Sequence, residues 1–254
     1  MNWVAWRTLL RKEVTRFSKV WMQTVLAPVV TSLLYLLVFG HVLEGRVEVF
    51  PGVGYTQFLI PGLLMMTVIQ NAFANTSSSI IQSKVMGNIL FVLLPPFSQL
   101  EFFLAYVGAA MLRGLAVGFG IFLLAIFYVD VPIHNLAVII VFVLLGSYTL
   151  GALGMIAGIW AEKFDQIAAF QSFLIVPLTF LSGVFYSIKS LPPLWATLSH
   201  WNPFFYMIDG FRYGFFGISD QSVWLSLVAM LIAACGLTVI CLSILRSGYK
   251  LRDA

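Results

Sequence analysis

Apolar stretches long enough to cross a lipid bilayer dominate the pattern of this 254-residue chain. A bilayer core about 30 Å thick needs roughly 20 apolar residues in a helix. Six stretches meet this requirement, covering residues 21–40, 57–82, 101–128, 136–160, 166–187 and 222–245. The pattern therefore predicts an all-α membrane protein with six transmembrane helices in a single transmembrane domain that spans residues 1–254.

Positive charges accumulate on one side of this arrangement. When alternate connections are assigned to opposite sides, one side receives ten lysines and arginines and the other receives three. The ten are Arg7, Arg11, Lys12, Arg16, Lys19, Lys84, Lys163, Arg246, Lys250 and Arg252, and the three are Arg46, Lys189 and Arg212. Because such an excess marks the cytoplasmic side, we expect both termini in the cytoplasm, with residues 246–254 as a cytoplasmic tail.

The first 20 residues repeat apolar groups at helical spacing. Their apolar positions are Trp3, Trp6, Leu10, Val14 and Phe17, and Lys12, Thr15, Arg16 and Lys19 occupy the other side. This pattern predicts an amphipathic helix in the cytoplasmic interface, although a simple basic flank to the first span would share the composition. The five basic side chains here and the lack of a small-residue cleavage site favour no cleavable signal peptide.

The apolar run over residues 57–94 is too long for one span, since 38 helical residues would measure roughly 57 Å. A break near Lys84 to Asn88 would leave residues 89–94 as a short helix on the cytoplasmic side. Pro95-Pro96 would end that helix.

Residues 188–221 fall outside the membrane by the charge count, yet they are rich in aromatic residues. Pro192-Pro193 and Asn202-Pro203 divide the segment into pieces too short to span, which favours two short re-entrant helices. Asp209 and Arg212 lie three positions apart on one helical face, so we expect them to pair and fix the segment. The aromatic residues predict an interfacial location, with an outer gate or sugar stacking as alternatives; they are Trp195, Trp201, Phe204, Phe205 and Tyr206.

Composition narrows the possible functions. Charged residues make up 9% of the chain and hydrophobic residues 61%, which leaves no room for a soluble catalytic domain. The net charge of +4 comes from basic residues beside apolar spans, so it indicates contact with the lipid bilayer and not with nucleic acid. No glycine-rich loop ending in Gly-Lys-Ser/Thr is present, so the chain does not hydrolyse ATP itself. The three histidines are isolated, which gives no metal site, and no local pattern suggests a catalytic nucleophile.

Polar residues inside the predicted spans are candidates for a substrate route. Arg113 lies near the middle of the third span, where it would pair with neighbouring helices or line the route of an anionic or glycosylated substrate. The second span becomes polar toward its cytoplasmic end. Its candidate residues are Gln70, Asn71, Asn75 and Ser78. These could form interhelical hydrogen bonds or a cytoplasmic gate. The pairs Gly114/Gly118 and Gly154/Gly158 favour close helix packing.

Several longer motifs resemble those of the type-2 ABC exporter permeases, in particular the bacterial YadH-like and NodJ-like permeases. The matching segments are Gln57-Phe58-Leu59-Ile60-Pro61-Gly62, Leu181-Ser182-Gly183-Val184-Phe185-Tyr186, Leu191-Pro192-Pro193 and Asn202-Pro203-Phe204-Phe205-Tyr206-Met207-Ile208-Asp209-Gly210-Phe211-Arg212-Tyr213-Gly214. The resemblance implies a homodimer in the bacterial inner membrane, seated on a separate ATP-binding-cassette ATPase subunit that binds the ATP and Mg. This chain would carry no cofactor.

The resemblance also implies that residues 84–96 form the coupling helix that docks on the ATPase. Gly87 and Pro95 match the family pattern there. Relatives commonly carry an acidic residue after that glycine, whereas Asn88, Ile89, Leu90 and Phe91 follow it here. We therefore expect Lys84 and residues 87–91 to make a more apolar contact than usual. The outer segment, with Trp201, Asn202, Pro203, Tyr206, Asp209 and Arg212, would form an outer gate.

Two other functions are compatible with the residues. A membrane-embedded transferase would place an active site near His200 and Asp209 at the outer interface, and it would act without an ATPase. A passive channel or a structural scaffold would need no chemistry at all.

Overall fold

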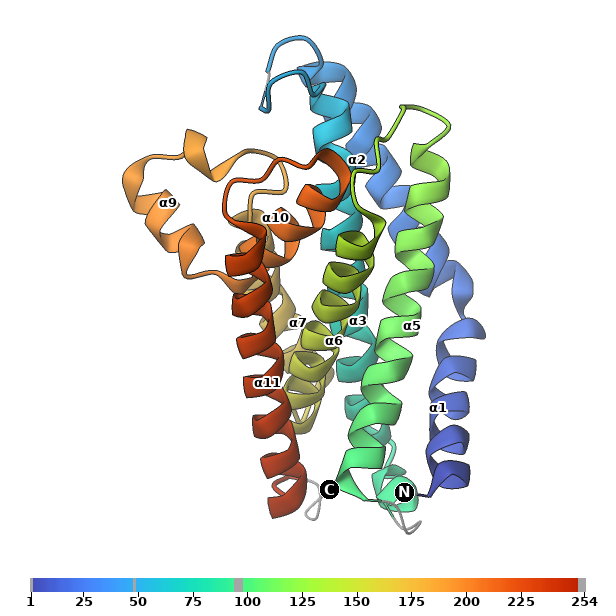
Figure 1. The fold of residues 1–254 in the computed structure, drawn as a ribbon. Coiled ribbons are helices and arrows are strands. Elements are labelled where there is room, and N and C mark those ends of the chain that lie inside the picture. The colour runs from blue at the N-terminus through green and yellow to red at the C-terminus, as the bar shows by residue number, and fades with distance from the viewer. Residues whose placement is uncertain (1, 48, 94–97, 251–254) are drawn as a thin grey trace.

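The computed structural model describes residues 2–47, 49–93 and 98–250, and it folds them into an upright bundle of helices (Figure 1). The elements in chain order are α1 (Trp3–Ser18), a π-helical turn (Met22–Leu26), α2 (Ala27–Leu43), α3 (Tyr55–Val85), α4 (Ile89–Leu93), α5 (Gln99–Ala125), α6 (Leu136–Trp160), α7 (Phe164–Phe170), a second π-helical turn (Gln171–Ile175), α8 (Val176–Phe180), a 3-10 turn (Ile188–Ser190), α9 (Pro193–His200), α10 (Pro203–Phe216) and α11 (Val223–Ser247). The start of α1 and the end of α11 lie at the same end of the bundle.

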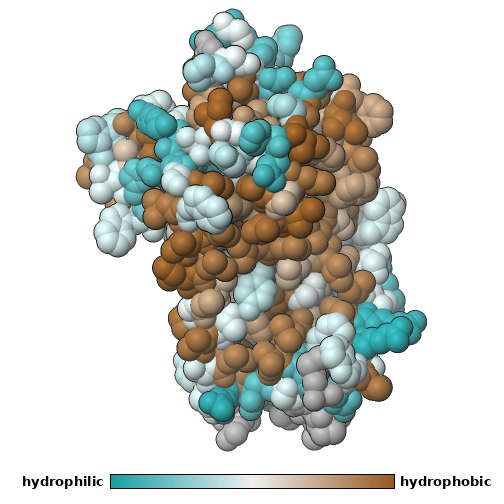
Figure 2. Space-filling model, viewed as in Figure 1, coloured by the Kyte–Doolittle hydropathy of each residue, from teal (hydrophilic) through white to brown (hydrophobic). Residues whose placement is uncertain are grey.

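Five helical segments in the described ranges are long and apolar enough to cross a membrane. They are Met22–Leu43, Tyr55–Val85, Gln99–Ala125, Leu136–Trp160 and Val223–Ser247. A broad apolar zone covers the middle of the visible surface, with hydrophilic residues gathered toward the two ends (Figure 2). The architecture confirms the predicted all-α membrane fold.

The predicted fifth span, residues 166–187, is shorter than expected, because its helix runs only from Phe164 to Phe180. Leu181 leaves helical geometry, and Gly183 adopts φ 78°, a left-handed conformation that suits glycine. The carbonyl groups of Gly183 and Val184 are then free of helix bonds, and both accept hydrogen bonds from Arg212. The chain therefore leaves the helix early where another segment supplies the lost hydrogen bonds.

Helix α3 is the centre of the bundle, packed against α5, α6, α2 and α10. Glycines bring the neighbouring backbones close. A methyl group at Gly154 would lie 2.4 Å from the Phe73 carbonyl oxygen, and one at Gly114 would lie 2.9 Å from the Val68 carbonyl oxygen. The predicted role of these small residues in close helix packing is confirmed.

Helix α1 is present and amphipathic, but it stands beside the lower part of α5 and does not lie flat across the end of the bundle (Figure 1). The Asn2 amide donates a hydrogen bond to the Glu101 carboxylate in the first turn of α5. Leu10 lies against Gly108, which is further along the same helix. Leu9, Glu13 and Phe17 are its buried residues. The upright course brings Glu13 and Arg16 into hydrogen-bonding contact with α3.

Candidate functional site

A cavity of about 440 Å³ lies between α2, α3 and the α7–α8 segment, and polar residues of α2, α3 and both π-helical turns line it. Gln70 and Asn71 contribute carboxamides from α3, and Gln171 contributes another from the second π-helical turn. At the side of α2, Ser32 and Thr67 share a hydrogen bond of 2.7 Å between their hydroxyl oxygens. This cavity combines neutral hydrogen-bonding groups with apolar walls, which suits an amphipathic molecule.

Arg113 lies behind this cavity and not in its lining. Its Nη2 donates a 3.0 Å hydrogen bond to Asn71 Oδ1, and the side chain is only 9% exposed. Asn71 in turn donates from Nδ2 to the Thr67 carbonyl at 3.0 Å. The structure thus brings Gln70 and Asn71 to the cavity and holds Arg113 one layer deeper through Asn71.

Asn75 and Ser78 belong to a different cluster. Asn75 is fully buried and accepts two hydrogen bonds from Arg16 Nη2, at 2.8 Å to its carbonyl and 3.0 Å to its side-chain oxygen. Ser78 is half-buried and donates to the same carbonyl. The five candidate pathway residues therefore divide between a cavity and a helix contact.

Glu13 of α1 completes this second cluster, and the sequence pattern did not identify it. The residue is fully buried, and its Oε2 accepts hydrogen bonds from Ser79 Oγ at 2.6 Å and Arg16 Nε at 3.1 Å. Lys12 Nζ lies 3.2 Å from Oε1. We call Lys12, Glu13, Arg16, Asn75 and Ser79 the α1–α3 clamp. The only signal for this cluster in the sequence is one acidic residue, Glu13, among the basic residues of an amphipathic helix.

At the end of the bundle where α1 begins, the predicted coupling segment divides into buried anchors and an exposed surface. Lys84 Nζ donates to the carbonyls of Ile159 and Ala161 at 2.8 and 2.6 Å, so it faces the end of α6 and not the docking side. Ile89 is fully buried, which makes it an anchor as well.

The exposed surface of this segment is apolar. Val85 is 54% exposed, Met86 62% and Phe91 71%, and the exposed Gly87 and Asn88 lie between them. Gly87 adopts φ 68°, so the turn between α3 and α4 requires its conformational freedom. Leu90 and Pro95 were also predicted to contact the ATPase, but their side chains are not among those that the structure describes.

The connection between α6 and α7 is tied to the chain after α11. Lys250 Nζ lies 2.6 Å from Glu162 Oε1. Its hydrogen bond and positive charge lower the pKa of Glu162, and the same hydrogen bond raises the pKa of Lys250. This exposed ion pair lies on the same side of the bundle as α4, because Glu162 directly follows the α6 end that Lys84 contacts.

At the opposite end, the expected pairing of Asp209 with Arg212 is wrong. Both side chains are 1% exposed, but no ion pair joins them within the described part of the chain. Asp209 accepts hydrogen bonds from the amides of Asp220 and Gln221 at 2.8 and 3.0 Å. Arg212 donates to Gly183 and Val184, and its guanidinium stacks 3.9 Å above the Phe58 ring. Each residue fixes a separate loop.

The remaining outer residues divide between structural caps and exposed aromatics. Asn202 caps α10 by accepting from the Phe204 amide, and its Nδ2 donates to the Leu178 carbonyl at 2.6 Å. Pro203 begins α10, and Tyr206 donates to the His200 carbonyl at 2.8 Å. Trp201 is 85% exposed, as an interfacial residue requires, whereas Phe204 and its neighbour Phe205 are buried.

Comparison with known proteins agrees with this architecture. The family model for the ABC-2 type transporter matches residues 4–216. The inner membrane transport permease YadH of Escherichia coli (strain K12) is 38% identical over 253 residues, which cover 100% of this chain and 99% of that protein. Nodulation protein J of Rhizobium leguminosarum bv. trifolii is 24% identical over 215 residues, 84% of this chain and 80% of that protein.

These matches extend over the same helices that build the bundle, from the first turns of α1 to the end of α10. The full-length relative adds α11 to the similarity. With several helices long enough to span a membrane, the chain is a multi-pass membrane permease. It belongs to the ABC-2 type transporter family.

Proposed function

We propose that the chain is the permease subunit of an ATP-driven exporter of the inner membrane, with ATP hydrolysed by a separate subunit. The substrate would be lipid-, glycan- or drug-like. The observation that carries this proposal is the apolar surface formed by Val85, Met86 and Phe91. This surface lies at the end of the bundle that the charge bias assigns to the cytoplasm, where large exposed apolar patches mark protein contacts.

A second copy of the chain would complete the route. The cavity between α2, α3 and α8 opens on the side of the bundle, and its carboxamides and hydroxyls cannot remain exposed to lipid without cost. A facing copy related by two-fold symmetry would cover both cavities and place them against each other. Gln70, Asn71 and Gln171 would then line a shared path.

ATP binding would draw two ATPase subunits together beneath the permease pair. The 84–96 segments would transmit that motion into α3, because Lys84 and the glycine contacts bind α3 firmly to α6. The cavity would open outward as α10 and its loops move relative to α8. Substrate would enter from the cytoplasm or the inner leaflet.

Co-purification with the ATPase tests the proposal. Met86→Glu with Phe91→Asp should abolish the association, since both side chains are exposed and their replacement leaves the buried core intact. Phe127→Asp, in the turn that follows the other end of α5 and 81% exposed, is the matched control and should not affect it. Unchanged co-purification of the double variant would contradict the coupling assignment.

Flux measurements separate the exporter from its rivals. An exporter in proteoliposomes shows little flux until the ATPase and ATP are added, whereas conductance of the chain alone would identify a channel. A transferase is disfavoured, because both carboxylate oxygens of Asp209 already accept backbone amides and the side chain is 1% exposed.

A further inference from the structure

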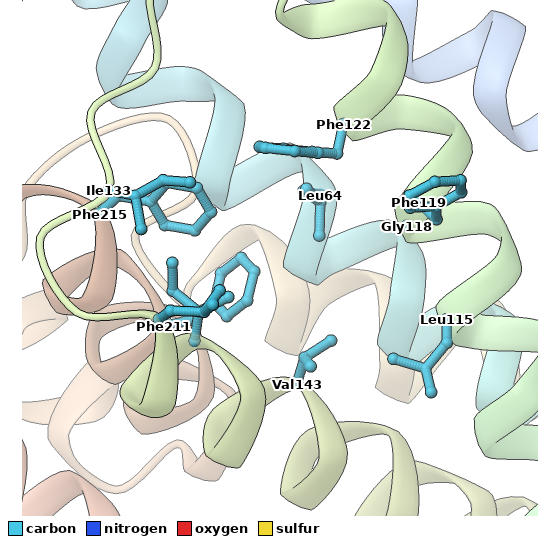
Figure 3. A pocket seen from close by; sticks show the side chains of 11 residues that line it. Leu64, Leu115, Gly118, Phe119, Phe122, Ile133, Val143, Phe211 and Phe215 are labelled. Atoms are coloured by element: carbon cyan, nitrogen blue, oxygen red, sulfur yellow. The ribbon is translucent and has the colours of Figure 1, made fainter.

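A cavity of about 240 Å³ opens between α5 and α6 (Figure 3), and it shares no lining residue with the polar cavity. Leu115 and Phe119 of α5 form one wall, and Val143 of α6 lies on the opposite side. Phe215 of α10 and Leu64 of α3 line its inner part. Every side chain in its lining is apolar.

The cavity is a wedge that helix packing and one loop create. Below it, α5 and α6 are in close contact, since a methyl group at Gly151 would lie 3.1 Å from the Ala110 side chain. Above it, the loop before α6 bonds the end of α10. His134 donates its amide hydrogen to the Phe215 carbonyl at 3.1 Å, and Asn135 donates to the Gly214 carbonyl at 2.8 Å. These contacts bound the wedge at its lower end and tie the loop above it to α10.

Water is a poor occupant for this space. A buried water molecule needs two to four polar partners, and the lining side chains offer none. The wall residues Phe119 and Leu136 are 63% and 58% exposed, and the middle of the visible face of the bundle is largely apolar (Figure 2). In a spanning protein, a cavity mouth with such walls faces the hydrocarbon of the bilayer.

We propose that this wedge binds the acyl chain of a membrane phospholipid from the leaflet on the α9–α10 side. An apolar cavity of about 150 Å³ accommodates a benzene-sized molecule, so the larger wedge can take a longer alkyl segment. Lipid hydrocarbon is as apolar as leucine. Moving an acyl chain from the bilayer into the wedge therefore gains no free energy from the hydrophobic effect. The chain is held because it restores the dispersion contacts that an empty wedge lacks.

An acyl chain in the wedge would contact the outer segment directly. Phe211 and Phe215 line the wedge from α10, and Arg212 between them fixes the loop at Gly183 and Val184. A bound chain therefore supports the position of α10 from the lipid side. This inference goes beyond the proposed function, because binding of a lipid to the wedge requires neither the ATPase nor transport. It can therefore be measured on the chain alone.

Photolabelling of the full chain tests the proposal. The chain is placed in nanodiscs of phosphatidylethanolamine and phosphatidylglycerol, doped with a phosphatidylethanolamine that carries a diazirine within one acyl chain. After illumination, peptide mass spectrometry maps the adducts. Labelling should concentrate on residues 115–122 and 133–143, above that of α11, where Val228 and Ile232 are 51% and 68% exposed.

Val143→Trp should fill the wedge and lower labelling there about fivefold, which corresponds to about 1 kcal/mol of lost binding. Val228→Trp adds the same indole to a lipid-facing helix and should leave the wedge adducts unchanged. Phe119→Ala removes part of one wall and the dispersion contacts that it offers, so this independent variant should also lower the labelling.

Three outcomes would overturn the proposal. The first is equal labelling of α11 and the wedge residues, and the second is wedge labelling that Val143→Trp does not change. The third is labelling of the wedge by a diazirine-bearing free fatty acid but not by the phospholipid probe, because the occupant would then be a free fatty acid.

Discussion

Two helices of this chain carry an acidic and a basic residue three positions apart, and the two pairs differ in their partners. In α1, Glu13 and Arg16 bond each other and also bond side chains of α3. In α10, Asp209 and Arg212 are both buried, whereas Arg16 of α1 is only partly so, and each of the two forms hydrogen bonds with backbone groups of a different loop. A spacing of three residues therefore brings an acidic and a basic side chain close together. Which groups they bond depends on the unpaired polar groups around them.

The backbone explains the difference. The chain leaves helical geometry after α8 and before α11, so amides and carbonyls in the outer loops lack partners of their own. A buried backbone group without a partner costs about 1–3 kcal/mol, which favours bonds from Asp209 and Arg212 to these groups over a direct pair. Next to α1, the backbone groups of α3 already bond one another within the helix. Side chains of α3 therefore supply most of the hydrogen-bond partners of Glu13 and Arg16. The outer contacts thus fix the chain path, whereas the α1–α3 clamp joins two intact helices.

The largest effect should follow from removing the outer guanidinium. Arg212→Met keeps much of the volume over Phe58 but leaves the Gly183 and Val184 carbonyls without this donor, which should lower stability by about 1–3 kcal/mol for each carbonyl. Thermal unfolding in detergent, followed by size-exclusion chromatography, measures the loss. The exposed Arg46→Met is the control and should stay within about 0.5 kcal/mol. Equal melting of both variants would contradict the structural role of Arg212.

A pair of double-mutant cycles should separate the two regions directly. Glu13→Gln and Arg16→Gln should show a coupling energy of about 1–2 kcal/mol, because the two side chains share a bond of 3.1 Å. Asp209→Asn and Arg212→Gln should couple by less than about 0.5 kcal/mol, because they bond separate loops. Unfolding free energies in mixed micelles supply both cycles. A strong outer coupling with a weak inner one would reverse the comparison.

The membrane explains which parts of this fold were predictable. Hydropathy and charge indicated the spans, because a bilayer admits few alternatives to a long apolar helix with basic cytoplasmic ends. The short fifth segment was missed, because its end depends on Arg212, about thirty residues away in the chain. Glu13 was missed because its partner Ser79 lies on another helix. Ile89 was assigned to a docking surface, although it is buried against the bundle.

A smaller effect is expected at the outer carboxylate. Asp209→Asn leaves one oxygen acceptor, so one of the Asp220 and Gln221 amides loses its partner. The cost of about 1.4 kcal/mol should speed hydrogen exchange in the peptide spanning residues 219–222 about tenfold. Asn202→Asp gives a control in a neighbouring cap that leaves these amides untouched. Unchanged exchange in the Asp209→Asn variant would show that the two amides do not depend on this carboxylate.

The smallest effect should come from the exposed pair of Glu162 and Lys250. The pKa of Glu162 lies below its ordinary value of 4.5, so the pairing is present above pH 4.5 and is lost as the pH falls through the lowered value. The pKa of Lys250 lies above 10.5, so its contribution is complete below pH 10.5 and is lost as the pH rises through the raised value. A spin label at Tyr249→Cys, with Cys235 and Cys241 replaced, should therefore become more mobile in acid. Glu162→Gln should abolish this acid step, and a step that persists in the variant would assign the titration to another group. Because Glu162 is exposed and Lys250 is only partly buried, the change should be confined to the residues near this pair and leave the α1–α3 clamp and the outer loops unaltered.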